Sequence, residues 1–207
     1  MNRIGTTLTA ALLAAVSVAA TADPVASPHR RGATEAGGDA EAAAAAKRGI
    51  EAMSALQTRL AGRLMAEMAR GGPVAAVGVC RDEAQQLTAS VSAELGIEIG
   101  RTSHRLRNPV NVARPWVAQL LPAYAGRRAE DAGMRIVDLG DRVGVVKPLA
   151  TQPLCLNCHG DRDAMAPDVR EMIAKAYPSD EATGFALGEV RGLIWAEIPK
   201  AGPGGNN

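Results

Sequence analysis

The sequence predicts an α+β fold, in which an N-terminal helical hairpin precedes an antiparallel sheet with helices inserted between its strands. Two observations support this prediction. Apolar residues recur every three or four positions between residues 39 and 95, with one interruption. Beyond residue 96, several short segments alternate apolar with polar residues, as strands do.

The first helix is expected to begin at about Asp39 and to end at Gly71-Gly72-Pro73, because this triplet interrupts a helix. Its apolar face is formed by Ile50, Met53, Leu56, Leu60, Leu64 and Met68. Pro73 suits the first position of a second helix, where its missing N–H would have no partner anyway. That helix carries an apolar face of Val74, Val77, Cys80, Ala84, Leu87, Val91 and Leu95, with Gly96 as its C-terminal cap. Cys80 is therefore predicted to face inward, and the two helices to pair as an antiparallel hairpin.

Four strands are expected, at residues 97–101, 134–139, 143–146 and 189–198. A turn at Gly140-Asp141 joins the middle two. Helices are predicted at 116–121 and at 167–177.

The N-terminus has the pattern of a secretory signal peptide: a short positive start, an apolar run from Ile4 to Ala20, and small residues before a cleavage site at Ala22. The alternative is an uncleaved membrane anchor. We therefore expect a signal peptide at 1–22, a flexible tether at 23–38, one domain at 39–199 and a disordered tail at 200–207. The mature protein is expected to be periplasmic or secreted, with no membrane contact beyond the signal peptide.

The charges are balanced and interspersed, with 23 Lys plus Arg against 22 Asp plus Glu. No large basic field is present to attract the phosphates of nucleic acid, so nucleic-acid binding is not expected.

Cys155-Leu156-Asn157-Cys158-His159 matches the attachment sequence of c-type haem. In this chemistry the two thiols form thioethers to the porphyrin, and the adjacent imidazole binds iron. Gly160 would let the chain turn away from the macrocycle. The motif therefore predicts one covalent haem held by Cys155, Cys158 and His159.

Two other sites would use the same residues. A thioredoxin-like redox pair would normally open a helix in a βαβ unit, which this pattern does not show. A zinc ion could be held by three Cys and one His if Cys80 joined the triplet, although such sites usually draw on two knuckles.

The second iron ligand is not settled by the motif. The candidates are Cys80, His104, Met134 and Met165, and Met165 follows His159 too closely to reach the opposite face. His104 lies in a strongly cationic segment, where a solvated surface histidine is expected. Cys80 alone would be taken for a small buried hydrophobe, but it is the unpaired third cysteine, and ferric iron could stabilise its thiolate.

Three arginines near His104 could bind the haem propionates, because guanidinium groups bond carboxylates bidentately. They are Arg101, Arg105 and Arg107. A charged strand edge that discourages aggregation would have the same pattern.

Taken in order, several blocks of the sequence resemble a bacterial c-type haem family long described as a domain of unknown function. The blocks are Cys80, Arg101-Thr102-Ser103, Arg107-Asn108-Pro109 with Asn111, Cys155 to Gly160, Tyr177-Pro178-Ser179-Asp180, and Thr183-Gly184-Phe185. The resemblance covers about residues 50 to 198. It implies a fold similar to PAS sensor domains, with His159 and Cys80 as the two axial ligands of a single haem. Members are found alone or fused to signalling modules, and no kinase or receptor segment is recognised in this chain.

Two functions follow as hypotheses: a sensor of redox state or of a small gaseous ligand, or an electron-transfer cytochrome c with a redox partner protein. Catalysis is not expected, because no arrangement of nucleophile, base and orienting group is recognised.

Overall fold

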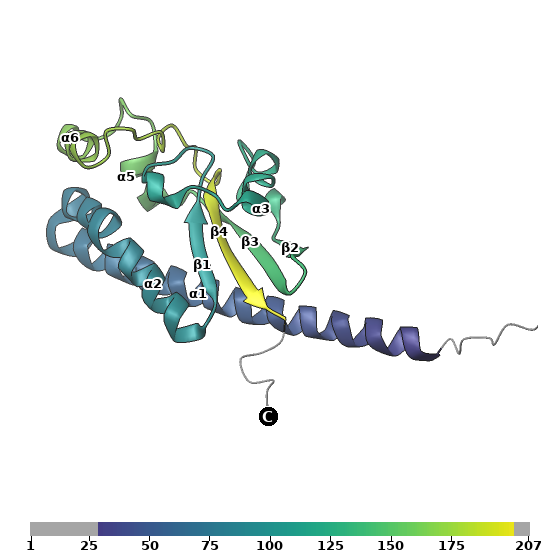
Figure 1. The fold of residues 1–207 in the computed structure, drawn as a ribbon. Helices are drawn as coiled ribbons and strands as arrows, with labels where there is room; N and C mark the ends of the chain where they lie inside the picture. Colours follow the sequence, from purple (N-terminus) through teal and green to yellow (C-terminus); the bar gives the residue numbers. More distant parts are fainter. Residues whose placement is uncertain (1–28, 201–207) are drawn as a thin grey trace, which may run out of the picture.

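The computed structural model describes residues 29–200, with side chains from residue 38 onward. The predicted signal peptide, the first part of the tether and residues 201–207 of the tail lie outside the described residues. The structure is α+β, as predicted, with a helical hairpin packed against a four-stranded antiparallel sheet (Figure 1).

The long N-terminal helix, α1 (His29–Gly78), begins ten residues before the predicted start at Asp39. The prediction of a flexible tether is therefore wrong for residues 29–38. Extending an existing helix avoids the cost of nucleation, so alanine and charged residues near the start outweigh the glycines among them. No helix in the part of the chain that the structure describes is long and apolar enough to cross a membrane.

The predicted break within this helix is confirmed. Gly71 and Gly72 leave helical geometry, and Gly72 takes the left-handed φ of 67° that glycine adopts at low cost. Pro73 then opens the second arm of the hairpin. This arm continues through a π-helix, η1 (Val79–Glu83), into α2 (Ala84–Leu95), which ends at Gly96 with a φ of 62° as predicted.

The sheet has the strand order β1-β4-β3-β2. Its strands are β1 (Glu98–Thr102), β2 (Arg135–Asp138), β3 (Arg142–Ala150) and β4 (Val190–Pro199), and every neighbouring pair is antiparallel. Three strands match their predictions closely. β3 runs four residues beyond the predicted end at Val146, and Pro148 is accommodated because β2 no longer pairs with β3 there.

The remaining elements are short and lie between strands. They are η2 (Pro109–Asn111), α3 (Pro115–Ala118), η3 (Leu121–Ala123), α4 (Ala129–Ala132), η4 (Pro153–Cys155), α5 (Leu156–His159) and α6 (Pro167–Ala176). The short helix predicted around 116–121 is present but shorter than predicted, because α3 ends at Ala118 and a 3₁₀ turn follows at η3. Pro122 could not continue an α-helix, since it lacks an N–H and clashes with the preceding turn.

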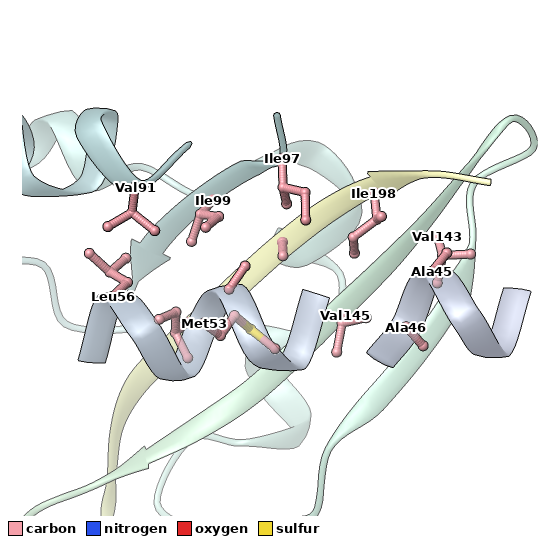
Figure 2. Packing of buried hydrophobic residues seen from close by; sticks show 13 residues of the cluster. Ala45, Ala46, Met53, Leu56, Val91, Ile97, Ile99, Val143, Val145 and Ile198 are labelled. Carbon is pink, nitrogen blue, oxygen red and sulfur yellow. The ribbon is translucent and has the colours of Figure 1, made fainter. Parts of the chain in front are cut away.

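One face of the sheet packs on α1 and α2 through aliphatic side chains, including Met53, Leu56, Val91, Val145 and Ile198 (Figure 2). The other face packs under α3 and its neighbours. There Trp116 meets Trp195 edge to face, with ring centroids 6.4 Å apart. These two cores fix the sheet, and one end of it carries the candidate site.

Candidate functional site

The Cys-x-x-Cys-His motif lies directly after β3, at the end of the sheet where β1 finishes and β4 begins (Figure 1). Cys155 ends η4, and Cys158 and His159 form the second half of α5. Gly160 follows with its Cα so close to the turn that an added Cβ would lie 2.7 Å from the carbonyl oxygen of Leu156. Glycine is therefore needed where the chain leaves the motif, as the sequence predicted.

His159 is held in one orientation by the chain between α6 and β4. Its Nδ1 lies 2.8 Å from the carbonyl oxygen of Ala182 and donates to it, while its own carbonyl oxygen accepts from the N–H of Phe185 at 3.0 Å. Burial, together with the positive charges of Arg107 and Arg191, lowers the pKa of His159 to about 3. The imidazole is therefore neutral at physiological pH, and with Nδ1 engaged, Nε2 is the nitrogen that could bind a metal.

Arg107, in the loop after β1, binds the motif and holds it in place. Its guanidinium group bonds both carboxylate oxygens of Asp180 at 3.0 Å each, and it also donates to the carbonyl oxygens of Cys158 at 2.5 Å and Ala182 at 3.2 Å. The arginine side chain is 11% exposed and that of Asp180 6%. The sequence predicted that Arg107 would bind a propionate. The contacts give it the task of joining the motif to the segment that orients His159.

Cys80 does not face the interior as the apolar period predicted; it is exposed. The reason is the π-helix in which it lies, because a wider turn breaks the three-or-four spacing on which the prediction relied. Burial, together with the charge of Cys80, raises the pKa of Tyr177 to about 12. Cys80 has the same effect on the Cys158 thiol, whose pKa is raised mainly by burial. The third cysteine is thus close enough to the motif to act on it electrostatically.

Arg101, at the end of β1, has a buried Nε with no hydrogen-bond partner. Burial lowers its pKa, and the charge of Cys80 opposes that shift. Arg191, near the start of β4, has a second buried Nε without a partner. An anion bound between these two arginines would satisfy both buried donors, and a buried donor without a partner is costly.

Sequence reasoning predicted Arg101 as a candidate for binding a propionate but missed Arg191. The available signal was an arginine near the start of a strand that is otherwise apolar. The side chains around the motif therefore fit a haem: two free thiols, a neutral imidazole with one nitrogen to spare, and two unsatisfied cationic donors.

His104 is not the solvated surface histidine that its cationic neighbours suggested. It is half-buried, its Nδ1 is enclosed without a partner, and burial lowers its pKa. Its ring meets that of Phe185 edge to face at 5.6 Å, while Arg105 lies 4.0 Å above the same phenyl ring. Arg105 also bonds Glu189 at 2.8 Å. His104 and Arg105 are therefore packed around Phe185, the only phenylalanine of the chain.

The surroundings of Met165 and Met134 favour neither residue as the second iron ligand. Met165 is buried in a cluster with Val77, Val169, Ile173 and Tyr177, and Met134 is 45% exposed just before β2.

The structure also bears on the two alternative sites. Among the residues whose side chains the structure describes, no group of three or more His, Cys, Asp or Glu is placed to hold a metal ion. The antiparallel sheet excludes the βαβ setting of a thioredoxin-like redox pair.

Comparison with known proteins agrees with these observations. The model of the Tll0287-like family matches residues 34–199, and the chain therefore belongs to this family. A solved structure, described as that of the cyanobacterial haem protein Tll0287, is similar over 85% of this chain and 98% of its own, with a TM-score of 0.57 and 19% sequence identity. A search of curated proteins found no match. The family membership inferred from the sequence is confirmed, and so is the fold class.

Proposed function

We propose that this member of the Tll0287-like family is an exported haem protein that carries one haem, bound covalently through Cys155 and Cys158. His159 and Cys80 are its axial ligands, and its role is to sense redox state or a small gaseous ligand. The observation on which the proposal depends is the His159 imidazole, neutral and held through Nδ1 by the Ala182 carbonyl oxygen. A histidine that binds haem iron is normally held in this way by a hydrogen bond from its other nitrogen.

The haem itself is supported by three independent features. The motif supplies two thiols and an imidazole at the spacing of c-type attachment. The similar structure is that of a protein described as a haem protein. The unpartnered Nε groups of Arg101 and Arg191 offer donors for the two propionates.

Cys80 is proposed as the second ligand because it is exposed rather than buried in the core, and because its charge acts on residues of the motif region. Its charge acts on Arg101, Cys158 and Tyr177, which come from three separate elements around the motif.

The sensor role depends on how firmly Cys80 is held. Bound iron supplies one-electron redox chemistry and a coordination position for a small ligand. Cys80 belongs to the helical hairpin and His159 to the segment after the sheet, so release of the Cys80 thiolate would remove the link that the iron makes between these two parts of the fold. The alternative is an electron-transfer cytochrome c, in which both ligands stay bound in both oxidation states.

Haem attachment is tested first. The full chain is expressed in a host that can attach haem and export the product, and the purified protein is examined by mass spectrometry and as its pyridine haemochrome. We expect a coloured periplasmic protein with one covalent haem and an N-terminus at Asp23. A colourless product, or one holding zinc, would refute the proposal.

The second ligand and the choice of function are tested together by comparing oxidised and reduced absorption spectra of wild type, Cys80→Ala and His104→Ala. We expect Cys80→Ala to change the ferric spectrum, whereas His104→Ala leaves the iron ligands unchanged because His104 packs on Phe185. Carbon monoxide should bind the reduced wild type if Cys80 is released on reduction. A reduced protein that excludes carbon monoxide and exchanges electrons rapidly would favour the electron carrier.

A further inference from the structure

Cys80 lies in a segment of unusual backbone geometry. Residues Val79–Glu83 form a π-helix between α1 and α2, and the N–H of Ala84 donates to the carbonyl oxygen of Val79. A π turn holds one more residue than an α turn, and such turns are rare and frequently found at functional sites. One residue corresponds to a rotation of about 100° around a helix. The direction in which Cys80 points relative to α2 therefore depends on whether this turn stays π-helical.

The last residue of the π turn is bound to the other arm of the hairpin. Glu83 accepts from Arg63 through both carboxylate oxygens, Nε to Oε2 at 2.6 Å and Nη2 to Oε1 at 2.9 Å. Arg63 is itself fixed, because its Nη1 donates to Glu67 at 2.7 Å. Glu67 is only 5% exposed and also pairs with Arg70 at 3.0 Å. The planar guanidinium group of Arg63 is thus held between two carboxylates and fixes the position of Glu83.

We infer that Arg63 is a positioning residue for the iron ligand Cys80, and that it acts through Glu83 by keeping the turn between Val79 and Glu83 π-helical. This inference rests on the proposed binding of haem iron by Cys80. When the bond to Glu83 is lost, the turn relaxes toward ordinary α-helical hydrogen bonding, and the Cys80 side chain rotates away from its position for binding.

The hairpin offers a matched control. Arg59 bonds Glu94 with the same bidentate geometry, at 2.7 and 2.6 Å, and joins the same two arms. Glu94 lies in α2, well after the π turn. Removing either arginine therefore deletes one cross-link of the hairpin, but only Arg63 holds the π turn.

The test compares haem-loaded wild type, Arg63→Met, Arg59→Met and Cys80→Ala. The ferric iron is examined by absorption and electron paramagnetic resonance, the haem content by the pyridine haemochrome, and amide hydrogen exchange is followed across residues 79–84. We expect Arg63→Met to keep its haem but lose the wild-type low-spin signal in part or in full, toward the spectrum of Cys80→Ala. Its exchange at residues 79–84 should change, while Arg59→Met matches the wild type in both measurements.

The outcomes separate the inference from the proposal beneath it. If Cys80→Ala changes the spectrum but Arg63→Met does not, or if Arg63→Met and Arg59→Met behave alike, the inference is overturned and Cys80 ligation stands. If Cys80→Ala has the wild-type spectrum, Cys80 ligation itself fails, and the inference with it. Should Arg63→Met give too little folded protein, Glu83→Gln compared with Glu94→Gln asks the same question with side chains of unchanged shape.

Discussion

Replacing Arg107 with methionine tests the contact that joins the motif to the rest of the site. The substitution leaves the Asp180 carboxylate, whose side chain is 6% exposed, without the guanidinium group that binds both its oxygens. Breaking a buried ion pair by removing one partner costs about 3–5 kcal/mol, because the remaining charge stays desolvated. At an m-value of roughly 2 kcal/mol/M, the urea midpoint should fall by about 1.5–2.5 M.

The assay is urea unfolding of the purified protein, followed by far-ultraviolet circular dichroism. Arg128→Met serves as the control, since Arg128 pairs with Glu130 on the surface, where both side chains are more than half exposed. The free energy of unfolding of Arg128→Met should be within about 0.5 kcal/mol of the wild-type value. The double variant Arg107→Met/Asp180→Leu removes both charges and should therefore lose less stability than the two single changes added together.

This reasoning is refuted if Arg107→Met unfolds within about 1 kcal/mol of the wild type, the range of an exposed ion pair. It is also refuted if the effects of the single changes at Arg107 and Asp180 add without coupling, because the buried pair would then contribute nothing as a pair.

Three further predictions follow from individual side chains. In haem-free protein, burial holds the pKa of His159 at about 3, below its ordinary 6.5, so the unfolded chain takes up the proton first. Stability should therefore fall between pH 6.5 and 3 by up to about 1.4 kcal/mol per pH unit, and urea unfolding at several pH values should show a slope that His159→Gln reduces. Gly100→Ala should cost about 1–3 kcal/mol, because a Cβ there would overlap the Trp195 indole, whereas Gly62→Ala, with open space around it, should stabilise by about 0.5–1 kcal/mol. Equal melting temperatures for these two variants would contradict the prediction. Met53→Ala, at a fully buried position, should cost about 2–5 kcal/mol in urea unfolding, and a loss under about 1 kcal/mol would show that the core had collapsed around the gap.

Much of the fold could be predicted because its signals are local. Gly71-Gly72-Pro73 breaks the hairpin, and Gly96 ends its second arm, since glycine and proline limit the backbone wherever they occur. The turn at Gly140, with a φ of 92°, joins β2 and β3 for the same reason. The start of α1 at His29 could not be placed, because helix extension is cooperative and depends on the helix that follows.

For the candidate site too, some features could be predicted from the sequence and others could not. The sequence alone determined the motif of Cys155, Cys158 and His159, because its spacing along the chain is itself the chemical requirement. Only the tertiary structure decided what surrounds the motif: the ion pair of Arg107 with Asp180, the buried Nε of Arg191, and the exposure of Cys80 in its π-helix. Each of these features depends on contacts between segments far apart in the sequence or on a choice between competing hydrogen bonds. The identity of a residue and of its neighbours in the sequence does not determine such contacts.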